Sequence, residues 1–232
     1  MLTLPTYRLA ILCAILVVLS GCAPDDWPAR GISRTEMRSI PLDRSEVVQA
    51  NLRIGAGELR IRGGSAQLVD ARFSYRRLRM RPEFRYDSGQ LTIEEPAGAN
   101  DGKYRWDLAF NDNKPLDLNI EFGAGQGRLN LGSLSLRHVD IHMGVGNLRV
   151  DLRGDPKNDY SLSIHGGVGD LTVYLPENAG VAADVQGGIG SIDARGLEKR
   201  DGRYVNAAYR HSKTNIQMDI QGGIGSVHLV GE

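Results

Sequence analysis

A short glycine motif recurs along this chain and constrains its fold more than any other feature. Aligned on Gly-x-Gly, the six copies are Gly55-Ala56-Gly57, Gly123-Ala124-Gly125, Gly144-Val145-Gly146, Gly167-Val168-Gly169, Gly188-Ile189-Gly190 and Gly223-Ile224-Gly225. From the second copy onward, successive first glycines are 21, 23, 21 and 35 residues apart. A period of about 22 residues is typical of one coil of a solenoid, in which each repeat contacts only its neighbours.

The residues before each copy alternate as in a β-strand. The position three residues before the first glycine is always apolar, and it holds Leu52, Ile120, Ile141, Ile164, Val185 and Ile220. The middle residue of each motif is apolar too, whereas the positions four and two before the first glycine are polar. Side chains at even spacing along a strand share a face, so we expect both apolar columns to face a common core and the polar columns to face water.

The alternation changes phase after each motif. The next apolar column lies four residues past the first glycine and holds Leu59, Leu148, Leu171, Ile192 and Val227. Such a change of parity requires a bend or bulge, and glycine suits a corner with unusual φ or close backbone approach. The sequence therefore predicts an all-β fold: a single-stranded β-solenoid, a β-helix-like stack of coils of about 22 residues, each stacked on the coil before it.

The chain outside these coils has its own pattern. Between the first two copies, alternation predicts short strands at residues 68–75, 78–80, 90–93 and 105–110, which we expect to form an N-terminal β-sheet cap that protects the solenoid edge. We expect an N-terminal β domain over residues 47–114 and solenoid repeats over 115–232. The long step between the last two copies contains an insertion around residues 196–213.

The N-terminus predicts a targeting segment. Arg8 precedes an apolar run over residues 9–19, which is shorter than a spanning helix requires. The residues Leu19-Ser20-Gly21-Cys22 resemble the lipobox of bacterial lipoproteins, which implies a signal peptide over residues 1–21 and acylation of Cys22, with palmitate as an acyl chain. The alternative is an ordinary signal peptide that contains a cysteine. We expect residues 22–46 to form a tether and a lead-in with one strand.

Composition narrows the classes of function. The chain of 232 residues is 41% hydrophobic and 24% charged, which is typical of a globular protein. Its 28 lysines and arginines balance 28 aspartates and glutamates, so nothing indicates a nucleic-acid partner. Each Gly-x-Gly runs into a strand rather than a helix, which argues against a dinucleotide site, and we expect no cofactor.

A group of histidines is the candidate for metal ligation. His138, Asp140 and His142 alternate along one expected strand and therefore share a face, and His165 occupies the column of His142 in the next coil. Imidazole and carboxylate groups are zinc ligands, so all four residues are candidates. The other interpretation, which we favour from sequence, is a polar outward face with no metal site.

A second candidate is a basic segment that contains Arg76, Arg77, Arg79 and Arg81. Basic residues close to a membrane gain from contact with anionic lipid head groups, and acidic envelope glycans offer similar charges. The alternative is an arginine-rich solvated strand that blunts a sheet edge.

Several stretches resemble the toast-rack domains of bacterial envelope proteins. They are residues 167–181, 187–192 and 220–227, and residues 51–61 with 71–75 and Pro82 resemble the N-terminal domain that accompanies them. The likeness runs from about Val47 to the C-terminus. The family is similar in sequence to the extracytoplasmic half of membrane regulators that report cell-wall antibiotic stress.

From these features we expect a lipid-anchored, non-enzymatic structural or interaction module of the cell envelope. Ala23 follows the cysteine where an aspartate would favour the inner membrane, so the lipobox resemblance implies the outer membrane, facing the periplasm. Expected partners are the membrane and an envelope protein or an anionic glycan or lipid. One alternative is a regulator of envelope-stress sensing that acts through a protein partner. Another is a polysaccharide-active enzyme that uses the carboxylates of Asp140, Asp184 and Asp219.

Overall fold

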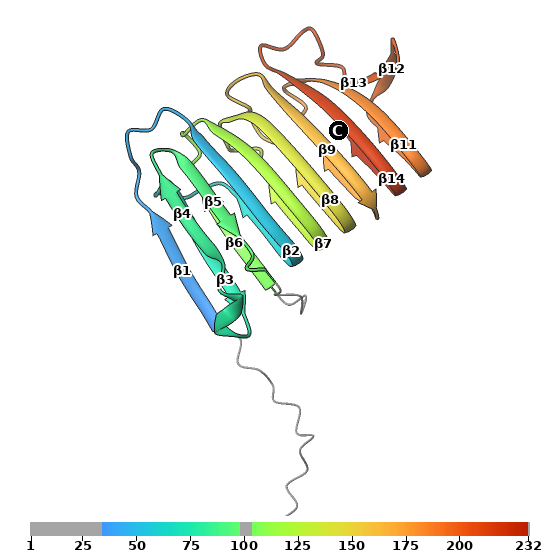
Figure 1. The fold of residues 1–232 in the computed structure, drawn as a ribbon. Coiled ribbons are helices and arrows are strands. Elements are labelled where there is room, and N and C mark those ends of the chain that lie inside the picture. Colours follow the sequence, from blue (N-terminus) through green and yellow to red (C-terminus); the bar gives the residue numbers. More distant parts are fainter. Residues whose placement is uncertain (1–33, 98–103, 232) are drawn as a thin grey trace, which may run out of the picture. The chain divides into compact units, whose positions relative to one another are not determined.

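Bent parallel strands form most of the fold (Figure 1). The computed structural model describes residues 34–97 and 104–231, so the expected signal peptide, Cys22 and residues 23–33 of the expected tether and lead-in lie outside the described residues. The coils are built by β2 (Val48–Arg62), β7 (Leu116–Asn130), β8 (Leu136–Asp151), β9 (Tyr160–Val168) with β10 (Leu171–Tyr174), β11 (Gly180–Arg195) and β14 (Asn215–Val230). The predicted all-β, solenoid-like fold class is confirmed.

Each coil consists of a first arm before the Gly-x-Gly corner and a second arm after it. Parallel pairing in register joins neighbouring coils through both arms, so that Ile120 pairs with Ile141 before the corner and Leu129 with Val150 after it. The apolar columns of both arms are buried: Ile141 is 1% exposed and Leu148 is 3% exposed. These two columns therefore form the core between the arms, as the alternation predicts.

The prediction for the middle residue of the motif was wrong. Val145, Val168, Ile189 and Ile224 are 53%, 44%, 73% and 51% exposed, although the alternation places them inside. The second glycine of the motif has positive φ in every copy, for example 134° at Gly146, and the backbone bends there. The bend turns the middle side chain to the outside of the corner.

The coils do not stack in sequence order. β14, the last strand along the chain, pairs with β9 and β10 on one side and with β11 on the other. The order across the sheet is therefore β8, then β9 with β10, then β14, then β11. The expectation that each coil stacks on the one before it holds from β2 to β10 and is wrong for the last two coils.

A small sheet caps the first coil, as predicted. On the second arm of β2 lie β6 (Tyr104–Phe110), β3 (Val69–Tyr75) and β1 (Arg34–Ile40), and on its first arm lie β5 (Gln90–Glu94) and β4 (Glu83–Asp87). The segment Leu78–Met80 is a short 3-10 helix, η1, and not the predicted strand, because Met80 and Arg81 close turn hydrogen bonds back to Arg77 and Leu78. β2 pairs with β7 over both arms. One continuous sheet therefore joins the expected N-terminal β domain, residues 47–114, to the expected repeats, residues 115–232.

The insertion contains a hairpin of β12 (Glu198–Arg200) and β13 (Arg203–Val205), which pairs with β11 at Ala182 and Ala183. Val205 is buried by this contact. Within residues 34–97 and 104–231, none of the helices has the length and apolar character needed to cross a membrane.

Candidate functional site

Arginines from neighbouring coils line a groove on the outer face of the second arm. We call it the arginine groove. It has a volume of about 710 Å³ and is lined by Arg60, Arg62, Arg128, Arg149 and Arg153 together with Asp107, Asn130, Asp151 and Tyr174 and the backbone around Ile61 and Leu108. Five guanidinium groups therefore share the groove with two carboxylates, and its charge is net positive.

The register of the coils brings three of these arginines into one row. Arg60 on β2 pairs with Arg128 on β7, and Arg128 pairs with Arg149 on β8. All three stand five residues past the first glycine of their motifs. This shared position is a sequence signal for the row, but the prediction of candidate residues missed it. The arginines are far apart along the chain, and only the stacking of coils places them on neighbouring strands, which lie about 4.8 Å apart.

Neighbouring like charges are unfavourable, and one partly buried carboxylate, that of Glu58, partly compensates them. Glu58 accepts hydrogen bonds from Arg60 at 2.6 Å, from Arg105 at 2.7 Å and from Arg128 at 2.5 Å. Burial acts to raise the pKa of Glu58, but the hydrogen bonds from Arg60 and Arg105 outweigh it and lower the pKa. Glu58 thus remains charged and anchors one end of the row.

The other end of the row lies against Tyr174. Arg149 donates a hydrogen bond of 2.6 Å to the Tyr174 hydroxyl, and the guanidinium carbons of Arg149 and Arg153 lie 5.0 and 4.7 Å from the ring centroid. Arg153 also holds Asp151 through contacts of 2.9 and 2.7 Å, and this pairing lowers the pKa of the Asp151 carboxyl. Arg149 is therefore oriented by an uncharged hydrogen-bond partner, and its charge also helps to lower the pKa of Asp151.

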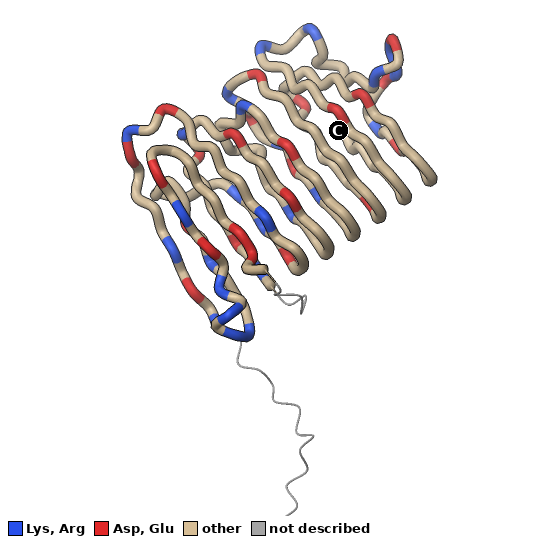
Figure 2. Tube along the Cα trace, in the orientation of Figure 1, with Lys and Arg blue, Asp and Glu red and all other residues tan. Residues whose placement is uncertain are grey.

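The basic segment predicted from sequence surrounds η1. Arg76, Arg77 and Arg79 are exposed there, and Figure 2 shows the basic residues gathered at this turn. Arg81 differs because it forms a two-pronged ion pair with Glu36 on β1, at 2.8 and 2.6 Å. The hydrogen bond from Arg81 lowers the pKa of Glu36 to about 2. Arg81 thus joins β1 to the turn, whereas the other three arginines face solvent.

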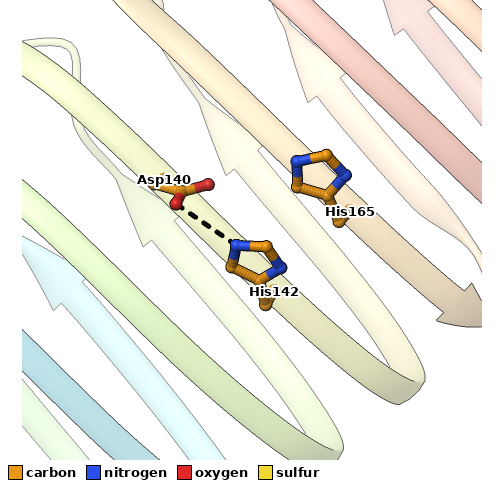
Figure 3. A group of neighbouring side chains, drawn as sticks. All are labelled: Asp140, His142 and His165. Carbon is orange, nitrogen blue, oxygen red and sulfur yellow. Dashed lines mark hydrogen bonds and ion pairs between the residues drawn. The ribbon is translucent and has the colours of Figure 1, made fainter.

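The candidate metal ligands divide into a group of three and one neighbour. His142 on β8 pairs in register with His165 on β9, and their rings stack with centroids 4.7 Å apart. Asp140 Oδ2 lies 3.2 Å from His142 Nε2, and one donor atom from each of these three residues lies within 4.8 Å of the others (Figure 3). His138 is outside this group, and its Nδ1 lies 2.7 Å from the Ser161 hydroxyl.

The fold places two members of the third set of sequence candidates side by side and separates the other from them. Asp140, Asp219 and Asp184 occupy one column, but Ser163 on β9 separates Asp140 from Asp219. Asp219 instead accepts a hydrogen bond of 3.3 Å from Gln221 on its own strand. Glycosidases use a pair of carboxylates on either side of the bond that is cut. In this column only Asp219 and Asp184 are neighbouring carboxylates.

Solved structures similar to this chain include two bacterial proteins. A crystal structure of a candidate cell adhesion protein from Clostridium sporogenes matches 86% of this chain and 100% of that chain, with a TM-score of 0.82 and 28% identity. A candidate adhesin from Bacteroides fragilis matches with a TM-score of 0.37 and 14% identity over 85% of this chain and 97% of that chain. A search of curated proteins found no match.

The family model described as the N-terminal domain of toast_rack, DUF2154, matches residues 29–174. This range runs from the end of the expected tether through β10 and includes the cap, the arginine row and the histidine group. The chain belongs to the toast-rack family.

Proposed function

We propose that this chain is a lipid-anchored, non-enzymatic interaction module of the bacterial cell envelope, and that its arginine groove binds acidic glycan chains. The observation that carries the proposal is the row of Arg60, Arg128 and Arg149, in which three coils present the same charge at the same position. Guanidinium groups bind carboxylate and phosphate groups through paired hydrogen bonds. A row of them suits a polymer whose anionic groups repeat.

The direction of the groove supports a long ligand. Its lining residues come from β2, β6, β7, β8 and β10, so the groove crosses strands that lie side by side. A chain-like ligand that follows the stack meets one arginine per coil from Arg60 to Arg149. The ligand makes ionic contacts at an exposed surface, so its affinity should fall as salt increases.

The relative from Clostridium sporogenes supports an interaction role. That protein is described as a candidate cell adhesion protein, and the likeness extends over its whole chain. Adhesion requires a rigid surface that presents binding groups, and a stack of paired strands offers one. Acylation of Cys22 would hold this surface at the outer membrane, facing the periplasm.

A binding measurement with matched charge variants tests the proposal. The full chain, purified in detergent, is titrated with polygalacturonate and with neutral dextran as the control polymer. We expect R128Q/R149Q to weaken polygalacturonate binding about tenfold, because two exposed ionic contacts contribute about 0.7 kcal/mol each. The control R76Q/R77Q removes the same charge from the basic turn at η1 and should change the affinity less than about twofold.

Two results would overturn the glycan assignment. One is equal weakening by both double variants, which would show attraction by net charge alone. The other is unchanged binding by R128Q/R149Q in a protein whose circular dichroism and melting match the parent chain. The anchor is tested separately in cells, where Cys22→Ser should abolish incorporation of labelled palmitate and release the chain from the membrane fraction.

A further inference from the structure

The histidine group on the first arm supports an inference that is independent of the arginine groove. We propose that Asp140, His142 and His165 form a binding site for a zinc-class divalent cation. Two imidazoles and one carboxylate are a ligand set typical of zinc, with a fourth position left for water or for a donor from a partner. The group shares no residue with the arginine groove, so either proposal can fail without the other.

The distances within the group are close to those of a coordination shell. Bonds of about 2.0–2.1 Å in a tetrahedron place ligand atoms about 3.3–3.4 Å apart. Asp140 Oδ2 and His142 Nε2 are already 3.2 Å apart, and the donor atoms of all three residues lie within 4.8 Å. The side chain of His142 is 55% exposed, so a modest rotation of the stacked rings can close the remaining gap.

Asp140 supplies a second, independent indication. Its Oδ2 contacts His142, while its Oδ1 is buried without a hydrogen-bond partner among the described residues. A buried carboxylate oxygen without a partner is costly, and such groups call for a physical explanation. A cation held by the two histidines and by both carboxylate oxygens of Asp140 would give Oδ1 a partner.

The surrounding charges favour a cation. Glu121 on β7 pairs with His142, and Asp219 on β14 pairs with Ser163, the residue two before His165. The nearest basic side chain in these columns is Arg53 on β2, which is held by Glu94 at 3.0 Å and by Glu121 at 3.1 Å. Asp140, Glu121 and Asp219 therefore lie on the strands around the two imidazoles, and the arginine in these columns is already paired with carboxylates.

Ser163 can act as an outer-shell group. Its hydroxyl lies 3.2 Å from Nε2 of His165, so it already orients the ring that would ligate the cation. If Nε2 binds the cation, it must turn away from this hydroxyl, which is then free to form a hydrogen bond with a water bound to the cation.

Zinc titration of the untagged, metal-free full chain in detergent tests the site. Calorimetry should show one Zn²⁺ per chain, and His142→Ala and His165→Ala should each weaken binding at least tenfold, since even outer-shell partners change metal affinity by about 10–100-fold. Asp140→Asn should also weaken it. His138→Ala is the matched control, because it removes a histidine from the same face of β8 outside the group.

A spectroscopic readout separates a defined site from weak surface binding. With Cu²⁺ as the probe, electron paramagnetic resonance should show two imidazole nitrogens in the parent chain and one in either histidine variant. Absence of stoichiometric Zn²⁺ binding would overturn the proposal. So would equal weakening by His138→Ala and His142→Ala in proteins that melt at the same temperature.

Discussion

At the scale of single residues, the second glycine of each motif determines how closely the coils approach. All six second glycines have φ between 133° and 149°. A Cβ atom on Gly125 would overlap the carbonyl oxygen of Gly57, and one on Gly146 would overlap that of Gly125. The corners can therefore stack only where both the backbone conformation and the space exclude a side chain.

We predict that Gly125→Ala lowers the free energy of unfolding by about 3 kcal/mol, because it combines a disfavoured φ with a clash against backbone. Gly166→Ala, in the residue just before the fourth motif, is the control. A methyl group added there would lie 3.9 Å from the nearest atom, the carbonyl oxygen of Gln221, and the φ of Gly166 is ordinary. The change at Gly166 should therefore stay within about 1 kcal/mol. Urea unfolding followed by circular dichroism measures both, and equal stability of the two variants would refute the packing argument.

At the scale of the strand, β8 shows where alternation stops being a guide to burial. The apolar alternation predicts that Val145 at the corner and Val150 on the second arm both lie inside. Val150 is 0% exposed as expected, whereas Val145 is 53% exposed. The difference arises because the corner turns the backbone between them. An alternation rule applies only while the strand stays extended.

The two valines allow a matched test. Val145→Thr should change the free energy of unfolding by less than about 0.5 kcal/mol, because the added hydroxyl remains in water. Val150→Thr should cost about 1–3 kcal/mol, because the same hydroxyl is buried among apolar side chains. Thermal and urea unfolding of both variants decides the point, and a large cost at Val145 would contradict the exposed corner.

At the scale of the whole described fold, the last strand occupies an interior place in the sheet. β14 contacts β9, β10 and β11 through parallel pairing, and Ile220 and Leu229 on it are both 0% exposed. β11 ends the row of coils, which leaves Ile192 37% exposed where Val227 on β14 is 4% exposed. The C-terminal residues are thus needed to connect the fifth coil along the chain to the rest.

We predict that truncation after Lys213, which removes β14, abolishes cooperative melting of the segment that contains β11. The first arm of β11 would lose its pairing with Asn215 through Gly222, and β9 would expose its open edge. Limited proteolysis should then cut within residues 180–195 while the region from β2 to β8 stays protected. A truncated chain in which β11 remains protected would show that the strand folds without β14.

Much of the fold follows from local pattern. The columns that contain Ile141 and Leu148 predict both faces of the arms, and Gly146 predicts the corner, because alternation and backbone freedom act within one coil. The same logic places His142 beside His165, since a period of about 22 residues implies register between adjacent coils. The arginine row also leaves a signal in the sequence, at the fifth position after each first glycine. The alignment on Gly-x-Gly shows that signal, but the gathering of the arginines into one groove follows only from the pairing of the coils, because Arg60, Arg128 and Arg149 are 68 and 21 residues apart along the chain.

Tertiary structure alone decided three things. These are the exposure of the corner residues, the place of β14 between β10 and β11, and the gathering of arginines from β2, β7 and β8 into one groove. The exposure of the corner residues depends on the backbone bend at the second glycine. The other two depend on pairing between segments that are distant along the chain. The sequence by itself determined the coil, its two faces and its glycine corner, because these arise from neighbouring residues. The order of the coils was left to packing, because parallel strands with the same alternating pattern can pair with more than one neighbour.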